Sequence, residues 1–325
     1  MAALLSLFVC VALPCAAAFA ESGEPIYTAY MSRDGTIRET KNRQGKSMGG
    51  YKERQKIEIY AVDPEWVTVK VNGREGYVLR TVIDRVEPID PEKTPPYGVE
   101  KFLYTAVVKE PVEIHYTDTS HVTLQKGARV SIISVTDGMA KIISWRRYSY
   151  IDTRSLESLT PVSCTDVPYS TETPIATYTS YYSTATDKAN IGRIENIRIA
   201  CEKLTRIVQP GEVLNFNTDI GPFSRKNGYQ EAPILIDGET KIGFGGGTCQ
   251  VSSTFYNVAL QLPGVTIDHR NPHGPSGAKY LPHGVDAAVG TDVQNLIIIN
   301  AYDFPIRIEA SAQDGALFMC VYRVQ

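Results

Sequence analysis

The stretch of this sequence that decides the fold of its C-terminal part is Gly243-Phe244-Gly245-Gly246-Gly247-Thr248-Cys249-Gln250-Val251-Ser252-Ser253-Thr254-Phe255-Tyr256-Asn257-Val258-Ala259-Leu260. Val251, Phe255 and Val258 recur at helical spacing, so we expect a helix to begin near Thr248. The glycines before it leave the backbone free to adopt positive φ angles and to approach a ligand closely. The stretch therefore predicts a glycine-rich turn that leads into a helix, with Cys249 in the first helical turn.

A cysteine at a helix N-terminus is a candidate nucleophile. The unpaired amides and the helix dipole favour an anion there, so we expect a depressed pKa for Cys249. The amides around Gly247–Gln250 are placed to stabilise the oxyanion that forms when a thiolate attacks a carbonyl. A phosphate-binding loop is disfavoured, because no Lys follows in the Walker position and the spacing is not that of a dinucleotide motif. The alternative interpretation is a tight turn with a buried, unreactive thiol.

Three of the five histidines lie downstream of this helix: His269, His273 and His283. A zinc site built from His269, His273 and Cys249 is the weaker hypothesis, because Pro272 interrupts any helix between the two histidines and no Glu lies between them. A Cys–His pair needs only one imidazole and a third group that orients it. The candidates for that third group are Asp268, Asn271 and Asp286.

Further elements are predicted on both sides of this region. Residues 187–208 have an apolar stripe at helical spacing, with Thr186 or Asp187 as the cap and Pro210-Gly211 as the stop. Alternating Thr, Ser and Tyr in 176–182 predict an exposed strand, and 316–324 a terminal strand. Cys201 and Cys320 lie on apolar surfaces of these elements and are expected to be buried thiols. Disulfides between Cys201 and Cys320, or between Cys164 and Cys201, stay open as alternatives.

The N-terminal half predicts small β domains. Residues 24–90 contain short alternating runs, and Asn72-Gly73 between Trp66–Val71 and Gly76-Tyr77-Val78 indicates a hairpin. This pattern resembles bacterial SH3 domains, and residues 97–160 read as a second, less regular copy. Trp66 and Trp145 are expected in the cores. Pro-rich residues 88–96 and the Pro, Ser and Thr-rich residues 161–174 indicate linkers, so the last domain spans 175–325.

Composition and the first residues narrow the possible functions. The 325 residues carry 33 Lys+Arg and 36 Asp+Glu, a net charge of −3, and are 43% hydrophobic. This balance argues against a nucleic-acid-binding protein and against a disordered chain. Residues 1–20 are uncharged and end in Ala18-Phe19-Ala20, which is typical of a signal peptide cleaved before Glu21; an uncleaved anchor over 4–19 or a lipoprotein site at Cys15 are weaker alternatives. We expect an exported protein without a membrane span in the mature chain.

Several motifs together resemble the VanW domain family. They occur in order between about 175 and 310 and are Gly211-Glu212-Val213-Leu214-Asn215-Phe216-Asn217, Gly221-Pro222, Gly228-Tyr229-x-x-Ala232, Gly245 to Asn257, Arg270-x-x-His273 and Tyr280-x-Pro282-x-Gly284-x-Asp286-Ala287. The resemblance implies a mainly β protein in which two small SH3-like β-barrels precede an α+β VanW domain. It also implies an exported bacterial protein, periplasmic or associated with the cell wall.

The resemblance further implies a function and a set of site residues. Some members of the family look like L,D-transpeptidases that act on peptidoglycan stem peptides, forming a 3→3 cross-link or releasing D-alanine. Carried over to this chain, Cys249 becomes the nucleophile and His273 the base, with Arg270 and Asp286 in support. Arg270 is also a candidate partner for a substrate carboxylate. The residues expected to bind substrate are Gly245, Gly246, Gly247, Thr248, Gln250, Ser252 and Tyr280. No metal or other cofactor is implied.

Three other functions compete with this one. The first is a non-catalytic peptidoglycan-binding protein in which Cys249 is structural. The second is a metal-dependent amidase, and the third is accessory binding of a glycopeptide antibiotic. The choice between water and an amine as acceptor stays open as well.

Overall fold

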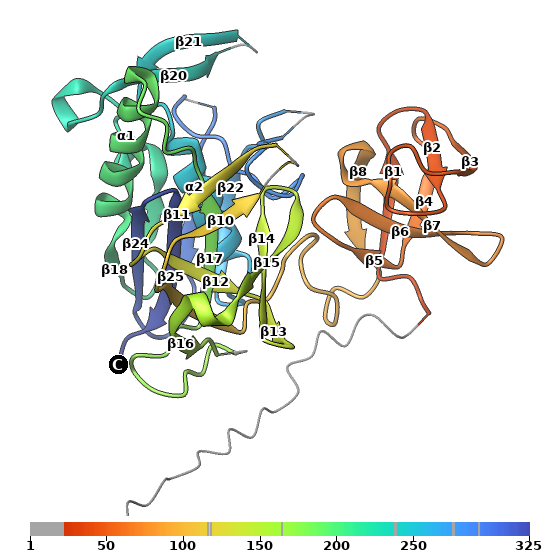
Figure 1. The fold of residues 1–325 in the computed structure, drawn as a ribbon, viewed down its shortest axis with the longest axis horizontal. Coiled ribbons are helices and arrows are strands. Elements are labelled where there is room, and N and C mark those ends of the chain that lie inside the picture. Colours follow the sequence, from red (N-terminus) through yellow and green to blue (C-terminus); the bar gives the residue numbers. More distant parts are fainter. Residues whose placement is uncertain are drawn as a thin grey trace, which may run out of the picture.

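The structure is a computed structural model that describes residues 23–325 except 116, 118, 164, 237–238, 275–276 and 292. The predicted signal peptide and Cys164 lie outside the described residues. The protein is mainly β with a few helices, as predicted. A β unit at the N-terminal end, in orange, lies beside a larger body that contains both α-helices (Figure 1). None of the helices in the described parts of the chain has the length and hydropathy needed to cross a bilayer.

The first β unit forms two sheets with the orders β4-β1-β8 and β3-β2-β7-β6-β5. Asn72 and Gly73 both have positive φ and close the predicted hairpin between β6 and β7, with Val71 opposite Arg74. The strands are β1 (Tyr27–Met31), β2 (Gly35–Arg38), β3 (Ser47–Tyr51), β4 (Lys56–Ile59), β5 (Ala61–Val62), β6 (Trp66–Val71), β7 (Arg74–Leu79) and β8 (Ile83–Pro88).

The expectation of closed SH3-like barrels is not met. In the first unit the two sheets are joined by short chain connections and not by strand pairing. Tyr60 connects β4 to β5, and the 3₁₀ turn Arg80–Val82 connects β7 to β8. Within residues 23–100, all of which are described, no strand pairing joins the other edges. The unit is therefore a pair of packed sheets around one small core. Trp66 is buried, but it does not belong to that core.

The second β unit forms a three-stranded sheet β12-β9-β16, a second sheet β13-β14-β15 and the hairpin β10-β11, again without closing into a barrel among its described residues. Its core of buried aliphatic side chains also takes in Tyr181 and Ala316 from the C-terminal part. Its strands are β9 (Tyr104–Val108), β10 (Val112–His115), β11 (His121–Leu124), β12 (Arg129–Ile132), β13 (Ser134–Thr136), β14 (Met139–Ser144), β15 (Arg147–Asp152) and β16 (Leu156–Pro161).

The C-terminal part is built from two sheets, a hairpin and two α-helices. The sheets have the orders β17-β25-β24-β18 and β19-β23-β22, and β20 pairs with β21. The elements are β17 (Ala176–Tyr181), α1 (Lys188–Leu204), β18 (Arg206–Val208), β19 (Val213–Asn215), β20 (Glu231–Ile236), β21 (Glu239–Phe244), α2 (Thr248–Ala259), β22 (Val265–Arg270), β23 (Leu296–Asn300), β24 (Ile306–Gln313) and β25 (Ala316–Arg323).

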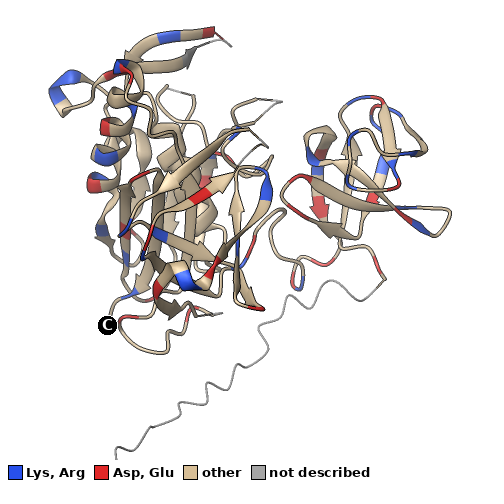
Figure 2. Ribbon diagram, in the orientation of Figure 1, with Lys and Arg blue, Asp and Glu red and all other residues tan. Residues whose placement is uncertain are grey.

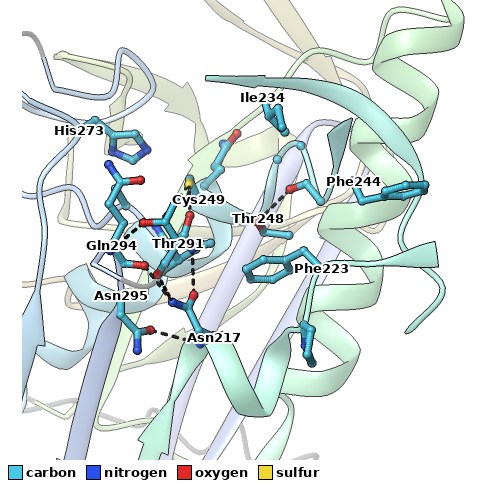
Figure 3. A pocket seen from close by; sticks show the side chains of 18 of the residues that line it. Asn217, Phe223, Ile234, Phe244, Thr248, Cys249, His273, Thr291, Gln294 and Asn295 are labelled. Carbon is cyan, nitrogen blue, oxygen red and sulfur yellow. Dashed lines mark hydrogen bonds between the residues drawn. The ribbon is translucent and has the colours of Figure 1, made fainter. Parts of the chain in front are cut away.

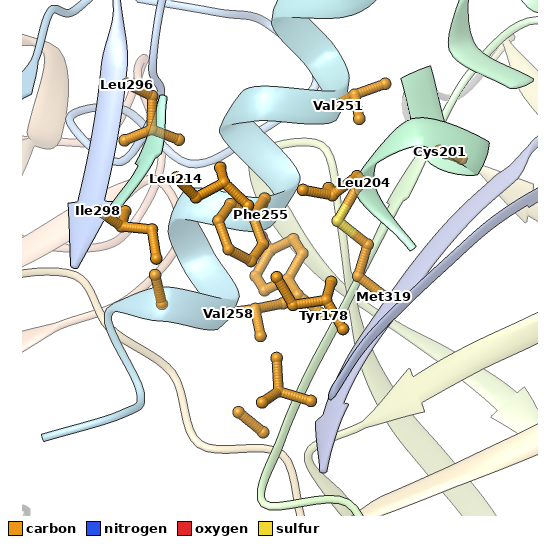
Figure 4. Close-up of a cluster of buried hydrophobic side chains, with 14 of the residues drawn as sticks. Tyr178, Cys201, Leu204, Leu214, Val251, Phe255, Val258, Leu296, Ile298 and Met319 are labelled. Carbon is orange, nitrogen blue, oxygen red and sulfur yellow. The ribbon is translucent and has the colours of Figure 1, made fainter. Parts of the chain in front are cut away.

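Helix α2 lies at the centre of the largest hydrophobic core. Val251, Phe255 and Val258 are almost fully buried and pack between Met319 of β25 on one side and Ile298 of β23 on the other (Figure 4). Burial of each such side chain contributes about 2 kcal/mol. This apolar stripe fixes the rotation of α2, and with it the direction in which Cys249 points.

Two predictions about neighbouring elements were wrong in part. Strand β17 is buried along its whole length rather than exposed, because α2 covers one face and β12 the other; Thr177 and Thr179 hydrogen-bond to Ser131 Oγ at 2.7 and 3.0 Å. Helix α1 is capped by Asp187 but ends at Leu204. Residues 206–208 instead form β18, because their backbone pairs with β24 at the sheet edge.

The cysteines of the described residues are free thiols. Cys201 and Cys320 are buried, and neither forms a disulfide. The Cys201–Cys320 alternative is therefore wrong for this structure.

Charged residues of both signs are interspersed along the chain, most visibly in α1 (Figure 2). There Arg198 pairs with Glu195 and Glu202, one turn away on either side. Such exposed pairs contribute little to stability, so this face tolerates substitution and offers control positions for experiments on α1.

Candidate active site

The glycine-rich turn before α2 is held by helix α1. Asn196 of α1 is fully buried and donates its Nδ2 to the carbonyl oxygens of Gly246 and Gln230, both at 3.0 Å. Gly247 has φ +105°, a value that L side chains rarely adopt. A Cβ at this position would lie 2.9 Å from Cγ of Arg193 and 3.0 Å from the Arg193 carbonyl oxygen. The glycine therefore lets the two helices approach each other at the start of α2.

We expect Gly247→Ala to lower the free energy of unfolding by about 3 kcal/mol, because a strained φ and a steric contact add together. Gly211→Ala is the matched control: Gly211 has φ +74°, but a Cβ there would meet nothing within 4 Å. It should lose only about 1 kcal/mol, from the backbone strain alone. Urea unfolding followed by circular dichroism measures both, and equal losses would contradict close packing at Gly247.

Cys249 lies in the first turn of α2 with backbone donors around it. The amides of Thr248 and Gln250 donate to Gly245 and Gly247 within the turn. Among the described residues, the amide of Cys249 itself has no acceptor. The sequence predicted that the backbone amides of Gly247–Gln250 donate to an oxyanion. In the structure the amides of Thr248 and Gln250 already donate to carbonyl oxygens of the turn, so fewer amides remain for an oxyanion.

One face of α2 holds an extended segment, residues 285–289, that passes alongside the helix. At successive turns of the helix, Asn257 Nδ2 donates to the Val285 carbonyl at 2.7 Å and Ser253 Oγ accepts from the Ala287 amide at 2.9 Å. One further turn toward the N-terminus, the Cys249 sulfur lies 3.4 Å from the Val289 carbonyl oxygen. The i, i+4 spacing of the helix thus matches alternate residues of the segment.

Asp286, in the middle of this segment, orients His273. Its Oδ2 lies 2.6 Å from Nδ1 of the ring and also accepts the His273 backbone N–H at 2.8 Å. Arg270 in turn donates its Nε to the Asp286 carbonyl oxygen at 2.6 Å and an Nη to the carboxylate at 3.3 Å. Since Nδ1 is engaged by the carboxylate, Nε2 is the ring nitrogen left for the sulfur of Cys249.

The pKa values of the pair reflect this arrangement. Burial lowers the pKa of His273, but hydrogen bonds to Asp286 and to the Cys249 sulfur outweigh it and raise that pKa to about 9. Burial raises the pKa of Asp286, yet the hydrogen bonds from His273 lower it to about 2. The ring is therefore an imidazolium at neutral pH, and it places a positive charge beside the sulfur.

Cys249 and His273 open into a cavity of about 750 Å³ (Figure 3). Apolar residues form one part of its wall, namely Pro222, Phe223, Pro233, Ile234 and Phe244. Amide side chains form another part, namely Asn215, Asn217, Gln294 and Asn295. Asn217 fixes the latter wall, since it donates to the carbonyls of Thr291 and Gln294 and accepts from the Gly290 amide. A cavity with one apolar and one hydrogen-bonding side suits a peptide-like ligand.

Most residues that the sequence singled out for substrate binding line this cavity: Gly245, Gly246, Gly247, Thr248, Gln250 and Tyr280. Ser252 does not. It is fully buried, and its hydroxyl donates to the Ala287 carbonyl at 2.7 Å, so in this structure it faces the 285–289 segment and not the cavity. Arg270 does not line the cavity either, because its guanidinium is held by Asp286 and the Gly284 carbonyl. A role beside Asp286 fits this position better than contact with a substrate carboxylate.

The alternative residues lie elsewhere. Asp268 and His269 are exposed on β22, and Nε2 of His269 lies 3.4 Å from the Val293 carbonyl oxygen. Asn271 pairs through its backbone with Ala288 and accepts the Asn295 amide. Within the described parts of the chain, no three His, Cys, Asp or Glu side chains are grouped so that they can hold a metal ion.

Sequence reasoning missed several residues that build the site. Ser253 and Asn257 hydrogen-bond to the backbone of the segment 285–289. Their position could have been predicted from the sequence, because both are polar residues at i+4 and i+8 from Cys249 on the same face of the helix. Arg193 was missed because a single Arg beside the apolar stripe of a predicted helix looks like a solvated surface residue.

Two comparisons with known proteins found similarity. Residues 192–322 match the family described as "VanW like protein". A protein of Bacillus subtilis (strain 168) described as "Uncharacterized protein YoaR" is 36% identical over 142 residues, which cover 43% of this chain and 46% of that protein. This chain thus matches about half the length of that relative. Residues 192–322 include the glycine-rich turn, α2 and the segment with His273 and Asp286, so this part of the protein is a VanW-like domain.

Proposed function

We propose that the VanW-like domain is a cysteine acyltransferase, with Cys249 as nucleophile, His273 as acid and base, and Asp286 as the group that orients the imidazole. The observation that carries the proposal is that Cys249 and His273 line the same open cavity while Asp286 holds the His273 ring through Nδ1 at 2.6 Å. A nucleophile, a base and an orienting carboxylate in this order are the parts that covalent acyl transfer needs.

The first half-reaction forms a thioester. The sulfur of Cys249 attacks the carbonyl carbon of the substrate amide and gives a tetrahedral oxyanion, which the free amide of Cys249 stabilises. The amide C–N bond then breaks as the proton on His273 Nε2 moves to the departing amine. The acyl group is now bonded to sulfur, His273 is neutral, and the amine leaves.

The second half-reaction releases the acyl group. An acceptor amine attacks the thioester carbon and gives its proton to His273 as the new C–N bond forms and the C–S bond breaks. With water as acceptor, the product is a carboxylic acid instead. Both routes restore the imidazolium beside the sulfur.

The substrate class we propose is the peptidoglycan stem peptide. The scissile bond joins the third residue, a diamino acid, to terminal D-alanine, and the acceptor is the side-chain amine of a second stem or water. Membership of the VanW-like family, which suggests association with the cell wall, supports this choice. The cavity, with one apolar wall and one amide wall, supports a peptide-like ligand. We accordingly propose an exported protein of the cell envelope, in which the two β units bind wall components.

Intact-protein mass spectrometry tests the proposal. Wild-type protein mixed with tetrapeptide muropeptides is expected to gain the mass of the tripeptide acyl group on Cys249 while D-alanine is released. New muropeptide dimers identify an amine acceptor, and tripeptides without dimers identify water. If the protein binds muropeptides saturably but forms no adduct and releases no D-alanine, the result contradicts the enzyme and favours a non-catalytic peptidoglycan-binding protein.

A further inference from the structure

Arg193 is a cation in the wall of the catalytic cavity that the chemistry above leaves without a task. It lies in the second turn of α1 and lines the cavity together with Cys249 and His273. Its side chain crosses the glycine-rich turn at Gly247, where a Cβ would meet its Cγ. The absence of a side chain at Gly247 therefore lets the arginine pass from the outer helix to the cavity.

Gln250 holds the guanidinium in place. The amide nitrogen of Gln250 donates to Ser180 Oγ and to the Tyr181 carbonyl oxygen, both at 3.0 Å. Because these two bonds fix the orientation of the amide, its oxygen has to face the other way, where it accepts a hydrogen bond from an Nη of Arg193. Strand β17 thus orients Gln250, and Gln250 orients Arg193.

The guanidinium has no counter-ion of its own. Among the described residues, no carboxylate lies within ion-pair distance of Arg193, and no Asp or Glu lines the cavity. Burial lowers the pKa of Arg193, as expected for a cation that is partly removed from water without an opposite charge. Arg193 lines the cavity, and among the described residues none of its nitrogens belongs to the sealed side-chain atoms without a hydrogen-bond partner.

An arginine in this state is suited to a carboxylate, which it binds through two parallel hydrogen bonds. In the proposed reaction the leaving amino acid carries such a group only a few bonds from the scissile carbonyl. Arg193 lines the same cavity as Cys249 and Tyr280.

We propose that Arg193 binds the terminal α-carboxylate of the acyl donor and makes the enzyme specific for the last peptide bond of a chain with a free C-terminus. This inference rests on the proposed function of Cys249. It assigns the arginine subsite to the leaving residue, and it explains why Gln250, which the sequence marked for substrate binding, faces an arginine: it acts as a positioning residue.

A binding experiment tests the subsite separately from catalysis. The Cys249→Ala variant is titrated calorimetrically with a tetrapeptide stem ending in D-alanine and with the same stem ending in D-alaninamide. We expect the free acid to bind about 10- to 100-fold more tightly, as loss of a charged hydrogen-bonded pair implies. In the double variant Cys249→Ala with Arg193→Gln, the two stems should bind equally, at the affinity of the amide.

Two further variants separate recognition from structure. Arg198→Gln removes a cation from the exposed face of the same helix and should keep the preference for the acid. Gln250→Glu keeps Arg193 but supplies a carboxylate to it, and should abolish the preference. Equal affinity of the two stems before Arg193 is changed, or an equal loss for both stems in Arg193→Gln, would overturn the proposal. The two proposals can also fail separately. If the acid preference depends on Arg193 but the wild-type protein forms no acyl adduct, the carboxylate subsite is upheld and the proposed enzyme activity is rejected.

Discussion

Replacement of Cys249 by Ala or Ser is expected to lower the rate of D-alanine release from tetrapeptide muropeptides by about 10⁴-fold or more. Alanine removes the atom that forms the thioester. Serine retains a nucleophilic atom in the same place, but its hydroxyl gives up a proton far less readily than a thiol, and the site lacks further groups that would activate it. The measurement is single-turnover release of D-alanine at neutral pH.

The other described cysteines supply the matched controls. Cys201 and Cys320 are both buried, and burial raises the pKa of each thiol, that of Cys320 to about 11. Cys201→Ala and Cys320→Ala should therefore change stability by about 1 kcal/mol while the rate stays within about twofold of wild type. Iodoacetamide at pH 7 should modify Cys249 and leave these two thiols intact, as peptide mapping would show. If Cys249→Ala released D-alanine at the wild-type rate, the sulfur of Cys249 would not be the nucleophile.

The sequence was a good guide wherever a local pattern fixes the structure. The glycine run and the spacing of Val251, Phe255 and Val258 predicted a helix from Thr248, and α2 begins there. The pair Asn72-Gly73 predicted its hairpin for the same kind of reason, since both residues accept positive φ. Of the three orienting groups considered for His273, the structure brings Asp286 to the ring.

The features that the sequence did not predict depend on contacts between distant parts of the chain. The alternation in β17 is that of an exposed strand, but its threonines pair with Ser131 of the second β unit, 46 and 48 residues away. Ser252 and Ser253 are neighbours in sequence and both are fully buried, yet only the structure shows that they hold the backbone of the segment that carries Asp286. Arg193 is 56 residues from Cys249, and its place in the cavity depends on the packing of α1 over Gly247.

The second large effect is expected for Asp286→Asn, which should lower the rate of acyl transfer by about 10³- to 10⁴-fold. The carboxylate side chain is only 2% exposed and holds both the ring and the backbone of His273. Asparagine keeps the shape but removes the charge that favours the imidazolium, and it leaves Arg270 without its ion pair. Asp268→Asn is the control, since Asp268 is exposed on β22, and it should be fully active.

The pH dependence of this variant tests the electrostatic role directly. In the wild type the pKa of His273 is raised from 6.5 to about 9, so the imidazolium and the activity that needs it should persist through neutral pH and decline as the pH rises through about 9. In Asp286→Asn the carboxylate no longer raises the pKa of His273 while burial still lowers it, so the decline should move to a lower pH. A decline at the same pH in both proteins would show that Asp286 does not set the charge of the ring.

The same shifts predict how stability depends on pH. A pKa raised on folding stabilises the protein fully below the unfolded value, so the contribution of His273 is complete below about pH 6.5 and is lost as the pH rises through about 9. The pKa of Asp286 is lowered from 3.8 to about 2, so its contribution is complete above about pH 4 and is lost as the pH falls through about 2. Both pKa shifts describe the interaction between His273 and Asp286, which contributes about 3 kcal/mol to the free energy of unfolding.

The difference in free energy of unfolding between wild type and Asp286→Asn, measured in urea, should therefore be largest between pH 4 and 6.5 and shrink toward pH 9. A difference that stays constant to pH 9 would mean that His273 is neutral in the folded protein.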